Sequence, residues 1–251
     1  MGLLELRQVT RRFGGIVALD EVSLDVTEGE IAGLIGPNGA GKTTAFNVIT
    51  RLYTPNGGSV RYAGEDLLKV APHRIVGLGI ARTFQNVELC KHMSVLDNVL
   101  VGAHARGRIG RDGGLSGEAA EILDYLRLGA HARRSAAGLP FGTLKRIELA
   151  RALAAKPKLL LLDEPAGGLN HEEVHELGEL IRSLREDFDL TVLLVEHHMN
   201  LVMSVSDRVT VLNFGRTIAA GTPREIQADP AVIEAYLGGG AHHDDGTPRA
   251  D

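Results

Sequence analysis

The sequence predicts an α/β fold built around a parallel sheet. Three observations carry this prediction: a glycine-rich loop at 36–44 separates an apolar strand from a helix, and continuous apolar runs follow at 159–162 and 191–195. Such runs are typical of central parallel strands that are covered on both faces. The 251 residues are enough for one large domain or two small ones.

The glycine-rich loop reads GPNGAGKT and is a complete G-x-x-x-x-G-K-[ST] phosphate-binding loop. Its glycines permit backbone conformations with φ > 0, and its successive N–H groups form an anion-binding nest at a helix N-terminus. Lys42 adds positive charge for the β- and γ-phosphates, and the Thr43 hydroxyl is placed for Mg²⁺. The predicted nucleotide-binding residues of the loop are Gly36, Pro37, Asn38, Gly39, Ala40, Gly41, Lys42, Thr43 and Thr44.

Polar residues follow both apolar strands. Asp163 ends the first strand and would hold Mg²⁺, and Glu164 beside it would orient or deprotonate a water at the γ-phosphate. His197 follows the second strand, and ligands lie beyond the carboxyl ends of parallel strands, so it would face the same crevice. An Asp-Glu pair can also be a helix cap, and a lone histidine is often structural. The phosphate loop upstream favours the catalytic interpretation.

Two further residues could contact the nucleotide. Gln85 follows a mostly apolar stretch and could reach Mg²⁺ or the attacking water. Phe13 lies upstream of the phosphate loop and could stack on adenine, and a buried core position is the alternative interpretation.

The composition is that of an ordinary globular protein, with 44 % hydrophobic and 24 % charged residues. The net charge of −5 provides no basic footprint for nucleic acid. A single cysteine, Cys90, excludes an internal disulfide and is expected to be a small buried apolar residue. No apolar run approaches the roughly 20 residues that span a bilayer, and the N-terminus is neither a signal peptide nor a myristoylation site. We therefore expect a cytosolic chain whose membrane role comes through a partner.

Hydrophobic periodicity and turn residues predict the other elements. Strands are expected at 3–9, 22–26 and 59–62 and twice within 207–220; helices at 95–100 after the capping residue Ser94, at 117–128 and at 172–186; a mobile loop at 107–117; and a disordered tail at 238–251.

Together these residues resemble the nucleotide-binding subunit of an ABC transporter, over residues 3–237. The phosphate loop, the ARTFQN segment containing Gln85, the LLLLDEP strand and the VEHHM segment around His197 occur in that family's order. The resemblance implies a P-loop NTPase (ABC ATPase) core with an N-terminal antiparallel β-subdomain and an inserted α-helical subdomain. It implies a single domain at 1–237, with the core and β-subdomain at 1–86 and 150–237 and the helical subdomain and signature at 87–149.

The family signature would lie at 139–143 and reads LPFGT instead of the usual LSGGQ. Pro140 replaces a serine whose hydroxyl contacts the partner's nucleotide, and Thr143 replaces a glutamine. Gly142 remains, so the contact would rest on backbone N–H groups at a helix N-terminus. Asn170 and His198 also stand where aspartates are usual.

Within the family, the chain is most similar to the ATPase subunits of branched-chain amino acid importers, as RTFQNVEL, MSVLDNVLVGAH and EPAGGLN indicate. The resemblance implies ATP and Mg²⁺ as cofactors, with Thr43, Gln85 and Asp163 on the metal and Glu164 and His197 in catalysis. The implied partners are transmembrane permease subunits, a second ATPase subunit in a homodimer or heterodimer and, indirectly, a substrate-binding protein, on the cytoplasmic face of the inner membrane. A urea, amide or other small-solute transporter, a soluble ABC ATPase and an inactive regulatory subunit remain as alternatives.

Overall fold

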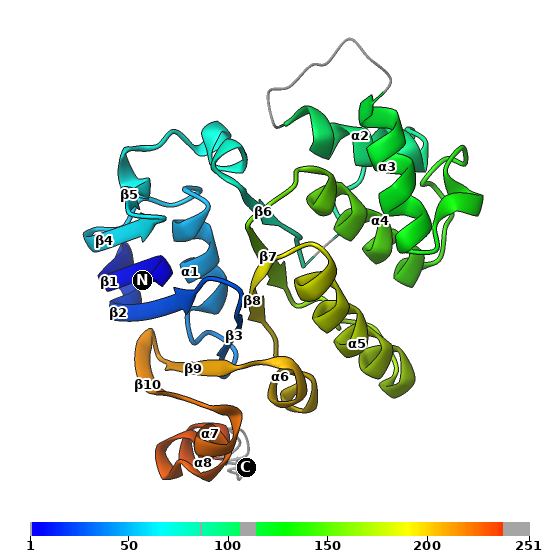
Figure 1. The fold of residues 1–251 in the computed structure, drawn as a ribbon. Helices are drawn as coiled ribbons and strands as arrows, with labels where there is room; N and C mark the ends of the chain where they lie inside the picture. The colour runs from blue at the N-terminus through cyan, green and yellow to red at the C-terminus, as the bar shows by residue number, and fades with distance from the viewer. Residues whose placement is uncertain (1, 86, 106–113, 238–251) are drawn as a thin grey trace, which may run out of the picture.

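A six-stranded sheet forms the centre of the computed structural model, which describes residues 2–85, 87–105 and 114–237 (Figure 1). In spatial order it comprises β10 (Arg216–Gly221), β9 (Arg208–Asn213), β3 (Ile31–Ile35), β8 (Thr191–Val195), β7 (Leu159–Asp163) and β6 (Ile80–Arg82). Every pairing is parallel except that of β10 with β9. This arrangement confirms the predicted α/β class.

The three central strands are buried at every position because both faces of the sheet are covered. Alternate residues pack on opposite sides, as the two-residue period of a strand requires. Leu160, Leu162 and Leu194 join the core beneath the helices. Leu159, Leu161 and Leu193 join a second core that the N-terminal strands and the loop helix close.

The second sheet is antiparallel and confirms the expected β-subdomain. Its strand order is β2 (Ile16–Thr27), β1 (Gly2–Phe13), β4 (Gly57–Tyr62) and β5 (Glu65–Asp66). Strands β1 and β2 are longer than the strands at 3–9 and 22–26 that the sequence predicted. Helix α1 (Lys42–Ile49) follows the phosphate loop and buries Phe46, Val48 and Ile49 in the core that it shares with this sheet. Three short 3₁₀ helices, η1 (Leu67–Lys69), η2 (Pro72–Arg74) and η3 (Val76–Leu78), lead to β6.

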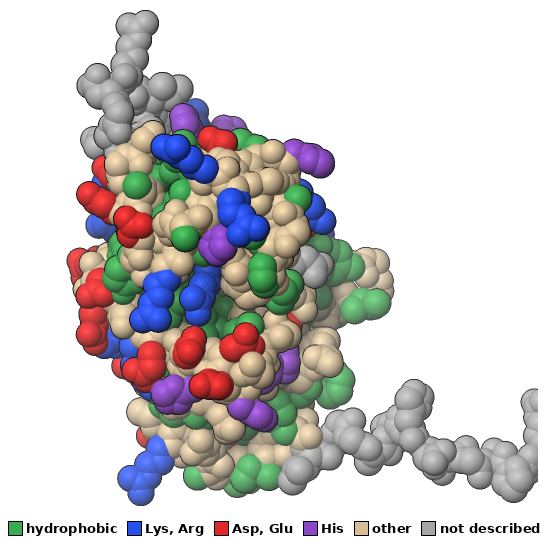
Figure 2. Space-filling view, turned by 90° about the vertical axis from the view of Figure 1, so that its right-hand side faces the viewer, with side chains coloured by type: hydrophobic (Ala, Val, Ile, Leu, Met, Phe, Trp, Pro, Cys, Tyr) green, Lys and Arg blue, Asp and Glu red, His purple; other side chains and the backbone are tan. Residues whose placement is uncertain are grey.

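A helical region lies at one end of the central sheet (Figure 1) and contains α2 (Val95–His104), α3 (Gly114–Tyr125), η4 (Gly129–His131) and α4 (Phe141–Ala154). Ser94 caps α2, as predicted, because its hydroxyl accepts the Asp97 N–H at 3.0 Å. Figure 2 views the molecule from this side: basic side chains lie over the upper and middle part of the face, and most acidic side chains lie along its left edge and in a band below.

The remaining helices are α5 (His171–Asp187), α6 (Met199–Val205), α7 (Pro223–Ala228) and α8 (Pro230–Leu237). Asn170 begins α5 with a capping box: its side chain accepts the N–H groups of Glu172 and Glu173, and the Glu173 carboxylate accepts the Asn170 N–H. Asparagine therefore serves as a full helix cap at this position. No helix among the described residues is both long and apolar enough to cross a membrane.

Two predictions of local structure are wrong. Cys90 is exposed, not buried, because it lies in the segment between β6 and α2, where its backbone is bonded to the buried Asn98 side chain. Residues 114–117 belong to α3, so the predicted mobile loop at 107–117 is wrong there, and its other residues lie outside the described chain. The predicted tail at 238–251 also lies outside it.

Candidate nucleotide site

The phosphate loop connects the carboxyl end of β3 to α1, as its sequence context predicted. Gly41 has φ +105° and a side chain there would meet the Ala18 carbonyl at 2.5 Å, so only glycine fits. The Lys42 ammonium donates to the carbonyls of Gly36 (2.8 Å) and Pro37 (3.0 Å). Burial lowers the pKa of Lys42, and the nearby Glu164 and Asp163 carboxylates oppose that shift. The exposed Thr43 lies in the first turn of α1.

Asp163 ends β7 with its carboxylate 3 % exposed. The Arg82 guanidinium, at the end of β6, donates to Asp163 Oδ2 at 2.7 Å. Asp163 Oδ1 is buried and has no hydrogen-bond partner within the described part of the chain. A buried carboxylate oxygen without a partner is costly, and this oxygen is therefore available to a ligand.

Glu164 has a left-handed backbone, with φ +47°, and its N–H donates to the Val195 carbonyl at 2.8 Å. This conformation is uncommon for a residue with a side chain and recurs at active sites. The Gln85 amide donates to Glu164 Oε2 at 2.6 Å. His197 Nδ1 lies 3.9 Å from the same oxygen. The structure thus brings together Gln85, Glu164 and His197, three residues that the sequence proposed from three separate strands.

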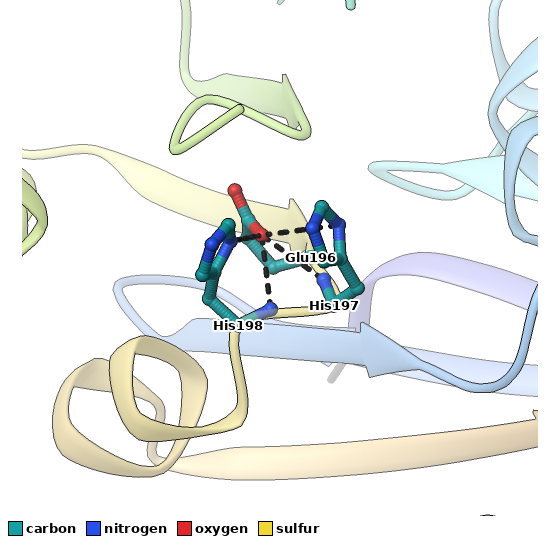
Figure 3. A group of neighbouring side chains, drawn as sticks. All are labelled: Glu196, His197 and His198. Atoms are coloured by element: carbon teal, nitrogen blue, oxygen red, sulfur yellow. Dashed lines mark hydrogen bonds and ion pairs between the residues drawn. The ribbon is translucent and has the colours of Figure 1, made fainter. Parts of the chain in front are cut away.

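Glu196 is a residue that sequence reasoning missed, and it anchors the turn that carries His197 (Figure 3). Its buried carboxylate accepts the backbone N–H groups of His197 (3.0 Å) and His198 (3.2 Å) and contacts His198 Nδ1 at 3.0 Å, all through Oε2. Oε1 accepts the Ala166 N–H at 2.6 Å. These bonds join the turn after β8 to the turn after β7. A charged residue at the end of an apolar strand was the available signal.

Lys145 is a second residue that was not predicted. It projects from α4 and donates from Nζ to the carbonyls of Gln85 (3.1 Å) and Glu164 (3.3 Å). Burial lowers its pKa. This lysine links the helical region to the loops that carry the two candidate residues.

The signature segment begins α4. Pro140 is the N-cap residue and supplies no side-chain cap, so the first N–H groups of the helix have no side-chain acceptor there. Gly142 lies in the first turn and lines a cleft of about 740 Å³ between α4 and α5.

Phe13 lies at the end of β1 and is 37 % exposed, which excludes the core position that the sequence left open. Its ring packs edge-to-face on Tyr53, with centroids 5.0 Å apart, and the Arg11 guanidinium lies 4.4 Å from its centroid. The ring therefore stands partly exposed at the surface, beside two side chains that support it.

Comparison with known proteins decides the family. The family model described as ABC transporter matches residues 19–167. This chain belongs to the ABC transporter ATP-binding family. A second model, described as branched-chain amino acid ATP-binding cassette transporter, matches residues 216–242. The family recognised from the motifs is therefore confirmed, and the chain is an ATP-binding transport ATPase.

Relatives of this ABC cassette match it over nearly their full length. It is 43 % identical to the high-affinity branched-chain amino acid transport ATP-binding protein BraF of Pseudomonas aeruginosa, over 94 % of this chain and 98 % of BraF. LivG of Escherichia coli K12 gives the same identity and coverage. The solved ADP conformation of the cassette MJ1267 aligns with a TM-score of 0.86 at 32 % identity, over 95 % of this chain and 99 % of that one.

Proposed function

We propose that this chain is the ATPase subunit of an importer for branched-chain amino acids. The observation that carries the proposal is its similarity to BraF and LivG along nearly the full length of those proteins, and the match of residues 216–242 to the branched-chain family model supports it. The transported molecule itself would be selected by other subunits, so the name of this subunit's relatives is the guide to its substrate class.

ATP would bind with its phosphates in the loop from Gly36 to Thr44. The N–H groups at the start of α1 would donate to the phosphates. The Lys42 ammonium donates to loop carbonyls in the structure and would bind the β- and γ-phosphates instead when ATP is present. The adenine would stack on the exposed face of Phe13. Each of these groups acts by placing positive potential or flat surface against the nucleotide.

The residues also fit Mg²⁺. Asp163 Oδ1 is a buried carboxylate oxygen without a hydrogen-bond partner among the described residues, and the Thr43 hydroxyl and the Gln85 amide supply further oxygen donors. When bound, the ion neutralises charge that develops on the phosphates. We assign Thr43 and Asp163 as its protein ligands, with Gln85 nearby.

Glu164 would act on the attacking water. Its Oε2 already accepts a hydrogen bond from Gln85, which orients the carboxylate, and its other oxygen is left to hold or deprotonate the water. His197 would assist at the γ-phosphate, positioned by the backbone bonds to Glu196. Because Lys145 contacts the carbonyls of Gln85 and Glu164, displacement of α4 would disturb both residues.

A second ATPase subunit would complete the site. In a head-to-tail pair, the N-terminus of α4 at Gly142 would cap the partner's nucleotide through backbone N–H groups, since Pro140 has no hydroxyl. Both a homodimer and a heterodimer satisfy this arrangement. The proposed helical subdomain (87–149) would press on permease subunits at the cytoplasmic face of the membrane. Helix α4 continues from this subdomain into the proposed core (1–86 and 150–237) without a break, so it connects the two parts.

Affinity purification from native membranes tests the importer. We expect the tagged chain, with and without ATP, to bring two multi-spanning permeases, a related ATPase and an amino-acid-binding protein, identified by mass spectrometry. The recovered binding protein should bind labelled leucine and not labelled urea, which separates the two transporter alternatives. Recovery of soluble partners alone would favour a non-transport ABC ATPase.

A further inference from the structure

Arg82 joins three elements around the predicted metal carboxylate. It ends β6, and its Nη1 donates to Asn47 Oδ1 (2.7 Å) and Thr50 Oγ1 (3.2 Å) at the end of α1. Its Nη2 donates to Asp163 Oδ2 (2.7 Å) at the end of β7. One guanidinium therefore connects the helix that follows the phosphate loop, the strand that precedes Gln85 and the candidate metal ligand.

Two aromatic rings lie beside the guanidinium, whose Nε is buried without a hydrogen-bond partner among the described residues. Its carbon lies 5.4 Å from the centroid of the Phe46 ring and 5.1 Å from that of the Phe84 ring. The side chains of Arg82 and Asp163 are only 6 % and 3 % exposed. A buried, multiply bonded ion pair has little freedom to rotate, so Asp163 is restricted to one orientation.

The two oxygens of Asp163 have different surroundings. Oδ2 is taken by Arg82, whereas Oδ1 is buried and has no partner among the residues that the structure describes. Buried polar atoms are usually hydrogen-bonded, so an unpaired carboxylate oxygen is a candidate position for a bound cation. The geometry leaves one anionic oxygen oriented and unused.

We propose that Arg82 is a positioning residue for the divalent cation of the nucleotide site: it binds Oδ2 of Asp163 so that Oδ1 is directed at the cation. The inference rests on the proposed function, which places ATP and Mg²⁺ at this site. Two effects oppose each other here. Fixing the ligand favours the cation, while the nearby positive charge repels it. The gain from a fixed Asp163 carboxylate is expected to exceed the repulsion between the Arg82 charge and the cation.

Mg²⁺-dependent nucleotide binding tests the proposal without measuring turnover. A fluorescent ATP analogue is titrated into the full chain and into Arg82→Met, first in EDTA and then at increasing Mg²⁺. We expect the affinity in EDTA to be nearly unchanged, because the phosphate loop is intact. The Mg²⁺ concentration for half-maximal enhancement should rise about 10- to 100-fold, as is typical when a residue that orients a metal ligand is lost.

Two further variants are titrated in the same way, one as a control and one as a milder test. Arg7→Met removes an exposed arginine that pairs with Asp25 in the other sheet, and it should leave both titrations unchanged. Asn47→Ala removes one anchor of Arg82 while keeping its charge, and a smaller shift of the same sign is expected. If Arg82→Met does not fold, Asn47→Ala provides the test, because this variant keeps the Arg82–Asp163 pair and leaves no unpaired buried charge.

Three outcomes overturn the proposal. An unchanged Mg²⁺ requirement in Arg82→Met or, should that variant not fold, in Asn47→Ala would make Arg82 a purely structural residue. Tighter Mg²⁺ binding in Arg82→Met would show that its charge competes with the cation. If the unchanged chain binds no nucleotide even in EDTA, the nucleotide site itself fails, and the role of Arg82 fails with it.

Discussion

At the scale of the residue, Glu164 is the side chain that we propose acts on the attacking water. Its left-handed backbone and its bond from Gln85 orient the carboxylate next to the phosphate loop. Glu164→Gln keeps the shape but removes the base, so we expect ATPase activity to fall about 10²- to 10⁴-fold while ATP binding persists. Steady-state phosphate release and nucleotide titration measure the two quantities.

Glu176→Gln is the matched control for that variant. Glu176 is an exposed glutamate of α5 that pairs with Arg146 on the surface, and its loss should leave turnover within about twofold. Near-normal phosphate release in Glu164→Gln would remove Glu164 from its proposed role and direct attention to His197.

At the scale of the element, the helical region depends on close contact between α2 and α4. A Cβ at Gly102 would lie 1.9 Å from the Arg151 carbonyl oxygen, so Gly102→Ala forces the two helices apart. Overpacking of this kind costs about 1–3 kcal/mol, although alanine is the better helix former. A lower midpoint of urea denaturation is expected, measured by circular dichroism.

Gly117→Ala provides the control for the helix contact. Gly117 lies on the exposed side of α3 with nothing within 4 Å of an added Cβ. Helix propensity alone then acts, and the substitution should raise stability by about 0.5–1 kcal/mol. Equal midpoints for the two variants would mean that α2 and α4 are free to separate.

At the scale of the whole molecule, nucleotide binding should stabilise the folded chain by mass action. Free ATP at 100 times its dissociation constant contributes about 2.7 kcal/mol, which for a domain of this size raises the melting temperature by roughly 5–10 °C. Lys42→Ala should lose most of this shift, because the buried ammonium is the main point charge of the loop. Differential scanning fluorimetry measures each shift against the same variant without ATP, and equal shifts in both proteins would contradict the role of Lys42.

Local pattern was sufficient for much of the fold and for the phosphate loop, Asp163, Glu164 and His197, whereas Gln85 and Gly142 came from the family resemblance. Backbone freedom at glycine and the spacing of Lys42 and Thr43 identify a phosphate loop within eight residues. Continuous apolar runs predict strands buried on both faces, and Asp163, Glu164 and His197 follow directly from their positions after those runs. Each of these signals lies within a few neighbouring residues, where sequence periodicity and turn chemistry act.

The contacts that orient these residues were decided only by the tertiary structure. Arg82 meets Asp163 across 81 positions of sequence, and Gln85 meets Glu164 across 79. Lys145 reaches both loops from α4, across 60 positions to Gln85 and 19 to Glu164. Such pairings depend on which strands become neighbours in the sheet. Long-range packing determines these neighbours, and local sequence patterns do not predict them.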